Sequence, residues 1–281
     1  MANTKSDRLL RERIQKTLDS PAPGSDSPSL RSMFIQAANR FESSGFVLTD
    51  PVQFPRRYTN KTDIEISAFI SSWISYGSRK VFLRILRELH RVMDDRGGPY
   101  NFIMSEKYRK PGAELVFCNP DDCLYRFFKW SDFLSLSQAL HSLYSQYDSM
   151  EHLLSSGKTL LENVNTLCSR FAGVKGIPVN GGSSANKRFY MFLRWMVRKN
   201  SPVDIGIWNT VEQSDLIIPL DTHVFSIAIK YGLTYRKTAN FKAAVEITMA
   251  MAEIWPKDPA KGDFALYGLG ISESPLLETS E

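Results

Sequence analysis

An aspartate stands where a helix is predicted to begin. In the segment IPLDTHVFSIAIKYGL, Asp221 directly precedes Val224, Ile227, Ala228 and Tyr231, which recur at helical spacing. An aspartate in that position caps a helix, because its carboxylate accepts hydrogen bonds from the free backbone N–H groups of the first turn. A carboxylate can also take part in acid–base chemistry, but this role requires a second group. On this pattern alone, capping is the simpler interpretation.

A basic helix is predicted upstream of this aspartate. The segment 173–186, GVKGIPVNGGSSAN, contains four glycines and a proline, so it is a loop that leads into KRFYMFLRWMVRK. One face of this helix is apolar, and Lys187, Arg194 and Arg198 lie on the opposite face. The helix can therefore pack with one side and contact phosphates with the other, and its N-terminus can hold an anion. A solvated basic face without a partner is the alternative interpretation.

The basic charge of the chain is concentrated around that helix. The net charge is +5, yet residues 163–203 contain seven Lys and Arg and no Asp or Glu. Because 5 − 7 = −2, the rest of the chain is slightly acidic. A local basic surface is what binding a polyanion requires.

Composition excludes several classes of protein. Among 281 residues, 43% are hydrophobic, which is enough to form a core. The three cysteines are too few for a disulfide framework, and the four histidines form no metal-binding pattern, so we expect no metal and no cofactor. The N-terminus lacks the apolar stretch of a secretory signal, and no run reaches membrane-spanning length. We therefore expect a cytoplasmic protein without a membrane partner.

The elements that must position these residues are helical. Apolar residues recur at helical spacing over 66–74, 81–89, 133–144, 153–171 and 241–255, and Gly77 separates the first two sets. No stretch alternates as strands joined by hairpin turns do. The pattern predicts an all-α protein of about ten helices. Residues 1–29 are predicted to form a basic helix and a flexible hinge, and 272–281 an acidic tail.

The string PLDTHV resembles a segment of the helix-hairpin-helix base-excision DNA glycosylase superfamily, in which an aspartate opens a helix within a VDTHV-like string. The stretch 187–233 is similar to a poorly characterised bacterial branch related to archaeal 8-oxoguanine DNA glycosylase. The resemblance implies a two-lobed helical fold with a cleft for double-stranded DNA and excision of a damaged base. In bifunctional members, a lysine attacks the sugar C1′, forms a Schiff base and allows the strand to be nicked.

The resemblance also implies roles for individual residues. Asp221 matches the catalytic aspartate, and Lys187, 34 residues upstream, matches the lysine nucleophile; Lys175 in the loop is the fallback. The charge of Arg188 and the helix dipole would both favour a neutral amine at Lys187. The residues expected to contact the DNA backbone are Lys175, Arg188, Arg194 and Arg198.

Three aromatic or acidic residues resemble positions at the base pocket. Tyr76 matches the helix boundary that supplies a residue wedged into the base stack, and Asp263 and Tyr267 match a carboxylate and a ring that contact the purine. Ordinary core or surface roles are the alternative for all three, and Trp73, Trp208 and Trp255 are expected in the core.

The chain also departs from the family pattern. The usual LxGxGxxTA hairpin is absent, and the longer 173–186 loop stands in its place as a modified hairpin. The resemblance places one lobe in residues 30–119 and 204–271 and the other in 120–203.

These features favour a monomeric glycosylase and abasic-site lyase acting on an oxidised purine such as 8-oxoguanine, associated with the bacterial nucleoid when bound to DNA. One alternative is a catalytically inactive DNA-binding protein that retains the fold. Another is a helical scaffold that binds an acidic protein, although this gives no reason for the PLDTHV string.

Overall fold

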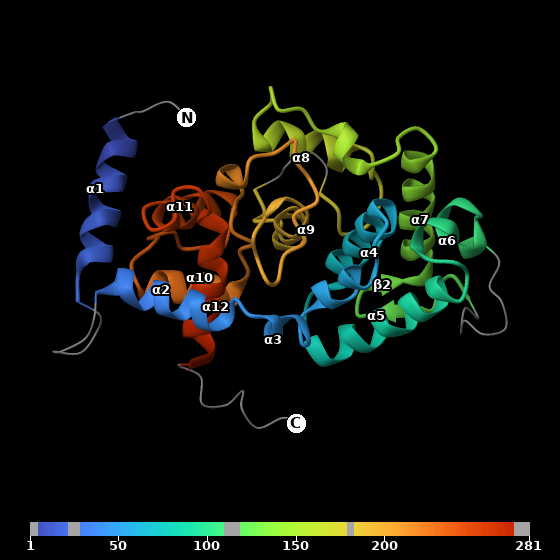
Figure 1. Cartoon of the computed structure of the whole chain (residues 1–281), viewed down its shortest axis with the longest axis horizontal. Helices are drawn as coiled ribbons and strands as arrows, with labels where there is room; N and C mark the ends of the chain where they lie inside the picture. Colours follow the sequence, from blue (N-terminus) through green and yellow to red (C-terminus); the bar gives the residue numbers. More distant parts are fainter. Residues whose placement is uncertain (1–4, 22–28, 110–118, 179–182, 273–281) are drawn as a thin grey trace.

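The computed structural model describes residues 5–21, 29–109, 119–178 and 183–272, and over these ranges the protein is mostly helical (Figure 1). The prediction of an all-α class is confirmed, with twelve α-helices in the described ranges rather than about ten. None of these helices has the length and apolar character needed to cross a membrane. The elements are α1 Lys5–Asp19, α2 Leu30–Phe41, α3 Ser44–Val47, α4 Lys61–Ile74, α5 Arg79–Asp94, α6 Pro99–Met104, β1 Cys123–Tyr125, β2 Phe128–Lys129, α7 Trp130–Tyr144, α8 Leu160–Ser169, α9 Lys187–Val197, α10 Thr222–Lys230, α11 Phe241–Ala252 and α12 Gly262–Ser272.

Local sequence explains where the helices begin and end. Helices α4 and α5 coincide with the two predicted apolar sets, and Gly77 between them has φ +76°, a conformation that glycine adopts without strain. The helix predicted over 153–171 is shorter, because Thr159 and Glu162 form a capping box that starts α8 at Leu160. The start of α10 directly after Asp221 is as predicted.

A small β-hairpin was not predicted. Strands β1 and β2 pair in antiparallel fashion, with Cys123 opposite Lys129 and Tyr125 opposite Phe128. Arg126 in the turn has φ +53°. Strands of three and two residues are too short to show the alternation from which a strand is recognised in sequence.

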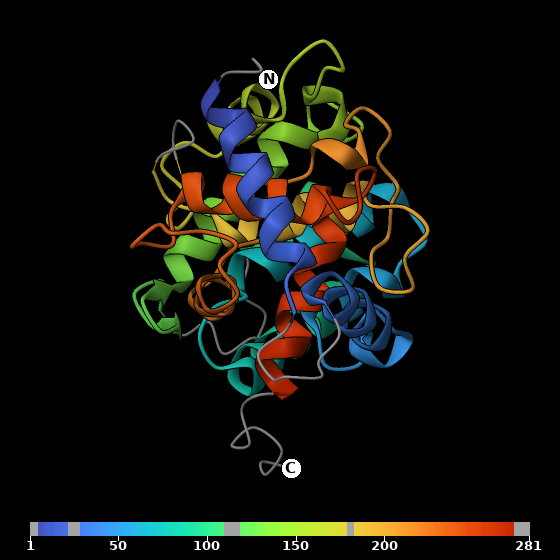
Figure 2. The ribbon, with the colours of Figure 1, turned by 90° about the vertical axis from the view of Figure 1, so that its left-hand side faces the viewer.

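The ends of the chain come together in space. Helices α1 and α2 pack with α10, α11 and α12 at one end of the molecule, and α4 to α7 form the other end (Figure 1). Figure 2 shows α1 lying across the first of these ends. Helix α9 lies between the two groups and is buried from Phe189 to Val197.

Contacts between helices cross the predicted lobe boundaries near residues 120 and 203. Helices α4 to α6, which precede the first boundary, pack on α7 and α9, which follow it. Helices α10 to α12 pack with α1 and α2, and α2 belongs to the segment that the prediction joins to them. The division into two lobes stays a prediction.

A buried carboxyl group joins four segments of the core. Glu65 of α4 accepts hydrogen bonds from Tyr144 Oη at 2.8 Å, Ser149 Oγ at 2.5 Å, Met150 N at 3.0 Å and Trp208 Nε1 at 2.7 Å. Every oxygen of this buried group is therefore satisfied. The contact also places the loop after α9 against α4, and it confirms Trp208 as a core residue.

Candidate functional site

A pocket of about 500 Å³ opens where three helices begin. Its wall is formed by the end of α4 and the following turn, the first residues of α5, α9 and α10, and the loop before α9. Helix N-termini carry partial positive charge and unpaired N–H groups, so their convergence favours an anionic ligand. The lining residues are Phe69, Ser72, Trp73, Ser75, Tyr76, Gly77, Arg79, Phe82, Gly176, Ile177, Pro178, Ser184, Asn186, Lys187, Arg188, Phe189, Asp221, Thr222 and His223.

Both residues predicted to carry the chemistry line this pocket. Lys187 is the first residue of α9 and is half-buried, with its Nζ 3.4 Å from the Met191 sulfur. Within the described ranges, Lys187 forms no ion pair. Asp221 caps α10, as the sequence predicts: its Oδ1 accepts hydrogen bonds from His223 N at 3.0 Å and Val224 N at 2.9 Å. Both bonds use Oδ1, and no described residue donates a hydrogen bond to the second carboxylate oxygen.

Aromatic rings form much of the pocket wall and hold the loop in place. Trp73, Tyr76 and Phe189 all line the pocket. The Trp73 indole N–H donates to the Lys175 carbonyl at 2.8 Å, and Arg188 donates to the carbonyls of Trp73 and Gly176. The loop before α9 is thus tied to the end of α4, which fixes where α9 begins.

Two lining residues were missed by the sequence analysis. Arg79, the first residue of α5, donates to the Tyr267 hydroxyl at 2.8 Å. His223 packs against Gly270 of α12, where a Cβ would clash with the imidazole. His223 belongs to the PLDTHV string and was available to sequence reasoning, whereas Arg79 carries no motif.

Asp263 and Tyr267 stand behind the pocket wall rather than in it. Neither lines the pocket, although both lie on α12 as a pair four residues apart. Asp263 forms an ion pair with Arg194. Burial raises the pKa of the Asp263 carboxyl to about 6, even though the charges of Arg194 and Lys187 oppose this shift. A direct contact of these two residues with a base stays a prediction.

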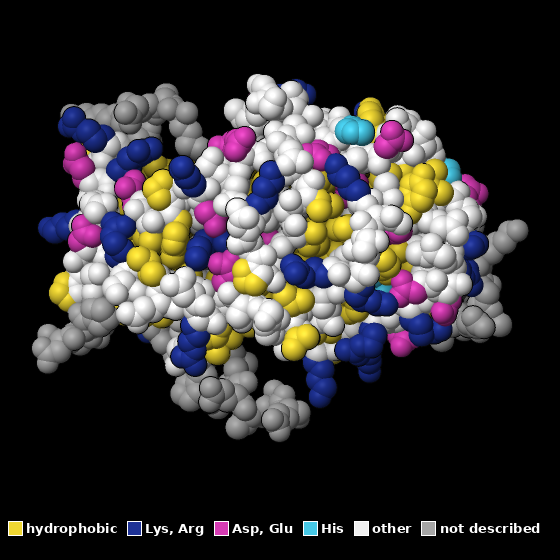
Figure 3. Space-filling view, in the orientation of Figure 1, with side chains coloured by type: hydrophobic (Ala, Val, Ile, Leu, Met, Phe, Trp, Pro, Cys, Tyr) yellow, Lys and Arg dark blue, Asp and Glu magenta, His cyan; other side chains and the backbone are white. Residues whose placement is uncertain are grey.

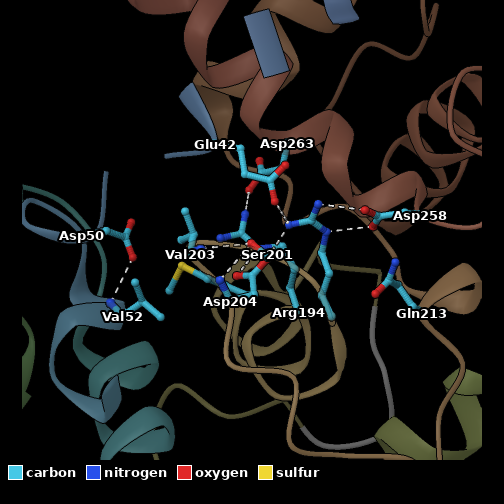
Figure 4. A network of polar contacts seen from close by, with 12 residues as sticks. Glu42, Asp50, Val52, Arg194, Ser201, Val203, Asp204, Gln213, Asp258 and Asp263 are labelled. Atoms are coloured by element: carbon cyan, nitrogen blue, oxygen red, sulfur yellow. Dashed lines mark hydrogen bonds and ion pairs between the residues drawn. The ribbon is translucent and has the colours of Figure 1, made fainter. Parts of the chain in front are cut away.

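The expected phosphate contacts of Arg194 and Arg198 are wrong. Each side chain is only 2–3% exposed, so neither can reach a surface ligand. Their partners lie far away in the sequence or beyond the acid-free stretch: Glu42, Asp204, Asp258 and Asp263 (Figure 4). Charge counted along the chain could not reveal these pairs, because folding supplies the counter-charges.

These contacts form a buried charge network around α9. Arg198 binds both oxygens of Asp258 at 2.7 Å each and also donates to Glu42 at 2.5 Å and Asp204 at 2.9 Å. Arg194 donates to Asp204 at 3.2 Å and to Asp263. The network therefore fastens the helix that carries Lys187 to the segment after α2, the loop after α9 and the start of α12.

The exposed basic face lies on α5 instead. Lys80, Arg84 and Arg87 are exposed and spaced by four and three residues, which places them on one side of the helix. Where the structure describes the chain, none of the three forms an ion pair. Figure 3 shows Lys and Arg side chains gathered along the edge of the molecule where α5 runs. Since α5 begins at the pocket with Arg79, this face leads directly to the candidate site.

The described ranges contain no group of three or more potential metal-ligating side chains. The ionisable side chains that line the pocket are an amine, a carboxylate, an imidazole, two guanidinium groups and a phenol, from Lys187, Asp221, His223, Arg79, Arg188 and Tyr76.

Replacing Arg198 with methionine tests the network. Arg198→Met leaves Glu42 and Asp258 without a guanidinium partner and leaves Asp204 with Arg194 alone, so we expect the free energy of unfolding to fall by about 3–5 kcal/mol. The exposed neighbour provides a control, since Lys199→Met should change it by no more than about 0.5 kcal/mol. Urea denaturation measures both. A surface phosphate contact would instead give an Arg198→Met protein of unchanged stability with weakened DNA binding.

Comparison with known proteins gives one finding. A family model described as a protein of unknown function, DUF2400, matches residues 50–272. Neither the search of curated proteins nor the search of solved structures returned a match. The matched span covers most of the chain and every residue that lines the pocket. This chain therefore belongs to the DUF2400 family of proteins of unknown function.

Proposed function

We propose that this protein is a DNA glycosylase with abasic-site lyase activity that excises an oxidised purine, 8-oxoguanine first among the candidates. The observation that carries the proposal is that Lys187 and Asp221, separated by 34 residues, line one aromatic-walled pocket at the convergence of three helix N-termini. Both residues were predicted from sequence, on the resemblance of PLDTHV to the glycosylase string. The protein would act as a monomer on cytoplasmic, nucleoid-associated double-stranded DNA.

Each group has a distinct step in the proposed reaction. The neutral amine of Lys187 attacks C1′ of the damaged nucleotide, the glycosidic bond breaks, and the base leaves with a proton. The carboxylate of Asp221 stabilises the positive charge that develops on the sugar, accepts the proton released by the amine and passes it to the departing base. O4′ takes a proton from water when the sugar ring opens. Ring opening gives a Schiff base between Lys187 and C1′. Loss of a proton from C2′ then expels the 3′ phosphate, which nicks the strand.

The pocket suits an unstacked base. A nucleotide must leave the helix to be reached by an amine, and the resulting flipped base needs flat apolar surfaces and a polar edge. Phe69, Trp73 and Phe189 supply rings, while Ser72 and Asn186 supply polar atoms. A volume of about 500 Å³ lies in the range of small-ligand pockets, and a purine nucleotide is of that class.

The proposed DNA path follows α5 rather than α9. Lys80, Arg84 and Arg87 offer exposed charge in line with the pocket, and Arg188 and the exposed Lys175 extend this charge on the loop side. The two groups of helices at the ends of the molecule would form the two lobes of a glycosylase fold, with the modified hairpin in the loop before α9.

The first prediction concerns the nucleophile. With duplex DNA carrying 8-oxoguanine opposite cytosine and borohydride present, the wild-type protein should become covalently joined to DNA, because hydride reduces the Schiff base to a stable amine. Lys187→Gln should give no adduct, whereas Lys175→Gln, which removes a proposed phosphate contact, should still give the adduct at saturating protein. Gel electrophoresis of labelled DNA provides the measurement. An adduct formed equally by Lys187→Gln would exclude this nucleophile, and salt-sensitive binding without product from any lesion would favour the inactive DNA-binding alternative.

A second prediction distinguishes a helix-capping role of Asp221 from a catalytic role. Asparagine caps helices as well as aspartate does, so Asp221→Asn should leave the unfolding midpoint unchanged. Removing the negative charge should nevertheless slow base excision by about 100-fold or more in single-turnover assays. Asp221→Ala should lose both activity and about 1 kcal/mol of stability. If Asp221→Asn excises at the wild-type rate, the residue is a cap only.

A third prediction concerns the basic face of α5. The slope of log K against log salt measures how many phosphates a protein neutralises. A triple variant with Lys80→Gln, Arg84→Gln and Arg87→Gln should show a slope smaller in magnitude by about 2 to 3, because each lost phosphate contact removes about 0.9. The same substitutions in another exposed group, Lys199→Gln, Lys242→Gln and Arg236→Gln, should have little effect. Equal slopes for the two triple variants would place the DNA elsewhere.

A further inference from the structure

A phenylalanine is exposed beside the pocket, at the tip of the unpredicted hairpin. Phe127 follows Arg126 in the turn between β1 and β2, and this phenylalanine is 52% exposed. Covering this ring with a partner would remove apolar surface from water, which is favourable. The hairpin contacts Tyr76 and Gly77, which line the pocket, so the ring lies next to the pocket wall.

The hairpin is held firmly in that position. Tyr76 Oη donates to the Tyr125 carbonyl at 3.2 Å, and Tyr125 Oη donates to the Tyr76 carbonyl at 2.5 Å. Arg126 lies over Gly77, where any Cβ would collide with the guanidinium. Lys175 donates to the carbonyl of Phe127 itself. Contacts with Tyr76, Gly77 and Lys175 therefore hold the tip of the hairpin in place, although the Phe127 ring itself is exposed.

Three cations lie close to this ring or to the Tyr76 ring stacked on it, and one of them, Lys175, also pairs with Asp132 at 3.4 Å. The Lys175 ammonium lies 5.6 Å from the centroid of the Phe127 ring. The guanidinium carbons of Arg126 and Arg188 lie 5.6 Å and 5.2 Å from the centroid of Tyr76. An exposed aromatic ring among cations matches a nucleic acid, whose bases stack on the ring while its phosphates contact the cations.

Tyr76, the wedge expected from sequence, is not the exposed ring. It is packed between Phe127, with centroids 4.7 Å apart and ring planes 29° apart, and the Arg188 guanidinium. Its hydroxyl is also committed to Tyr125. Tyr76 therefore supports Phe127 by stacking on one face of its ring.

We propose that Phe127 inserts into duplex DNA next to the nucleotide that enters the pocket and stacks in the vacated space, with Arg126 and Lys175 on the flanking phosphates. This inference rests on the proposed DNA partner, and it assigns a residue and an element that the glycosylase resemblance does not name. Side chains inserted between bases stabilise unstacked DNA, which lowers the cost of flipping.

The test uses binding alone, on a duplex with one tetrahydrofuran abasic analogue opposite 2-aminopurine and on the matching intact duplex. Wild type should prefer the abasic duplex and change the 2-aminopurine fluorescence, because the inserted ring alters its stacking. Phe127→Ala should bind the abasic duplex about tenfold more weakly and lose the fluorescence change, since stacking on one base supplies a factor of this order. Its affinity for intact duplex should be unchanged.

Two further variants serve as controls. Phe127→Trp keeps a stacking ring and should retain the preference. Tyr235→Ala removes another exposed aromatic, 65% exposed and packed on Arg13 of α1, and should behave as wild type. A Phe127→Ala protein with the wild-type preference and fluorescence change overturns this inference while leaving the proposed function intact. A wild-type protein that binds neither duplex overturns both.

Discussion

The buried charge network around α9 is the interaction on which the site depends. Two arginines near the end of this helix, Arg194 and Arg198, are nearly inaccessible to water and are neutralised by carboxylates from segments both before and after it. Desolvated charges are tolerated only when paired with good geometry, so the network permits little freedom in how these segments meet. It sets the position of α9 and, at its other end, of Lys187.

Around this fixed helix, contacts at its start complete the pocket. Arg188 and Trp73 bind the loop before α9 to the end of α4, and Asp221 holds the first turn of α10. The lysine and the aspartate are thus placed on rigid helix starts rather than on free loops. Rigid placement is what a covalent reaction requires, because misplacement by about 1 Å can cost a hundredfold in rate.

Sequence patterns predicted the local structure more accurately than they predicted where the basic charges lie. Apolar spacing located α4, α5 and α7, and Asp221 was identified as a cap because its partners are two and three residues away. By contrast, the basic face was assigned to α9 although it lies on α5. Three of the four carboxylates that pair with Arg194 and Arg198 come from distant segments, so no local window could show that both charges are neutralised inside the protein.

The residues of the candidate site likewise fall into those that the sequence predicted and those that only the structure showed. Lys187, Asp221 and Tyr76 were named from sequence and line one pocket, while Arg79 reaches it only because α5 begins there. Asp263 and Tyr267 are behind the wall, and the hairpin that presents Phe127 was missed because its strands are two and three residues long. Motifs predict residues with local signatures, and packing decides which other residues join them.

The most direct measurement of the central claim is the identity of the residue that becomes attached to DNA. The complex reduced with borohydride on an 8-oxoguanine duplex would be digested with nucleases and protease, and the modified peptide located by mass spectrometry. The account predicts a deoxyribose-derived mass on Lys187. Modification of Lys175 or another amine, or the absence of any modified peptide, would contradict it.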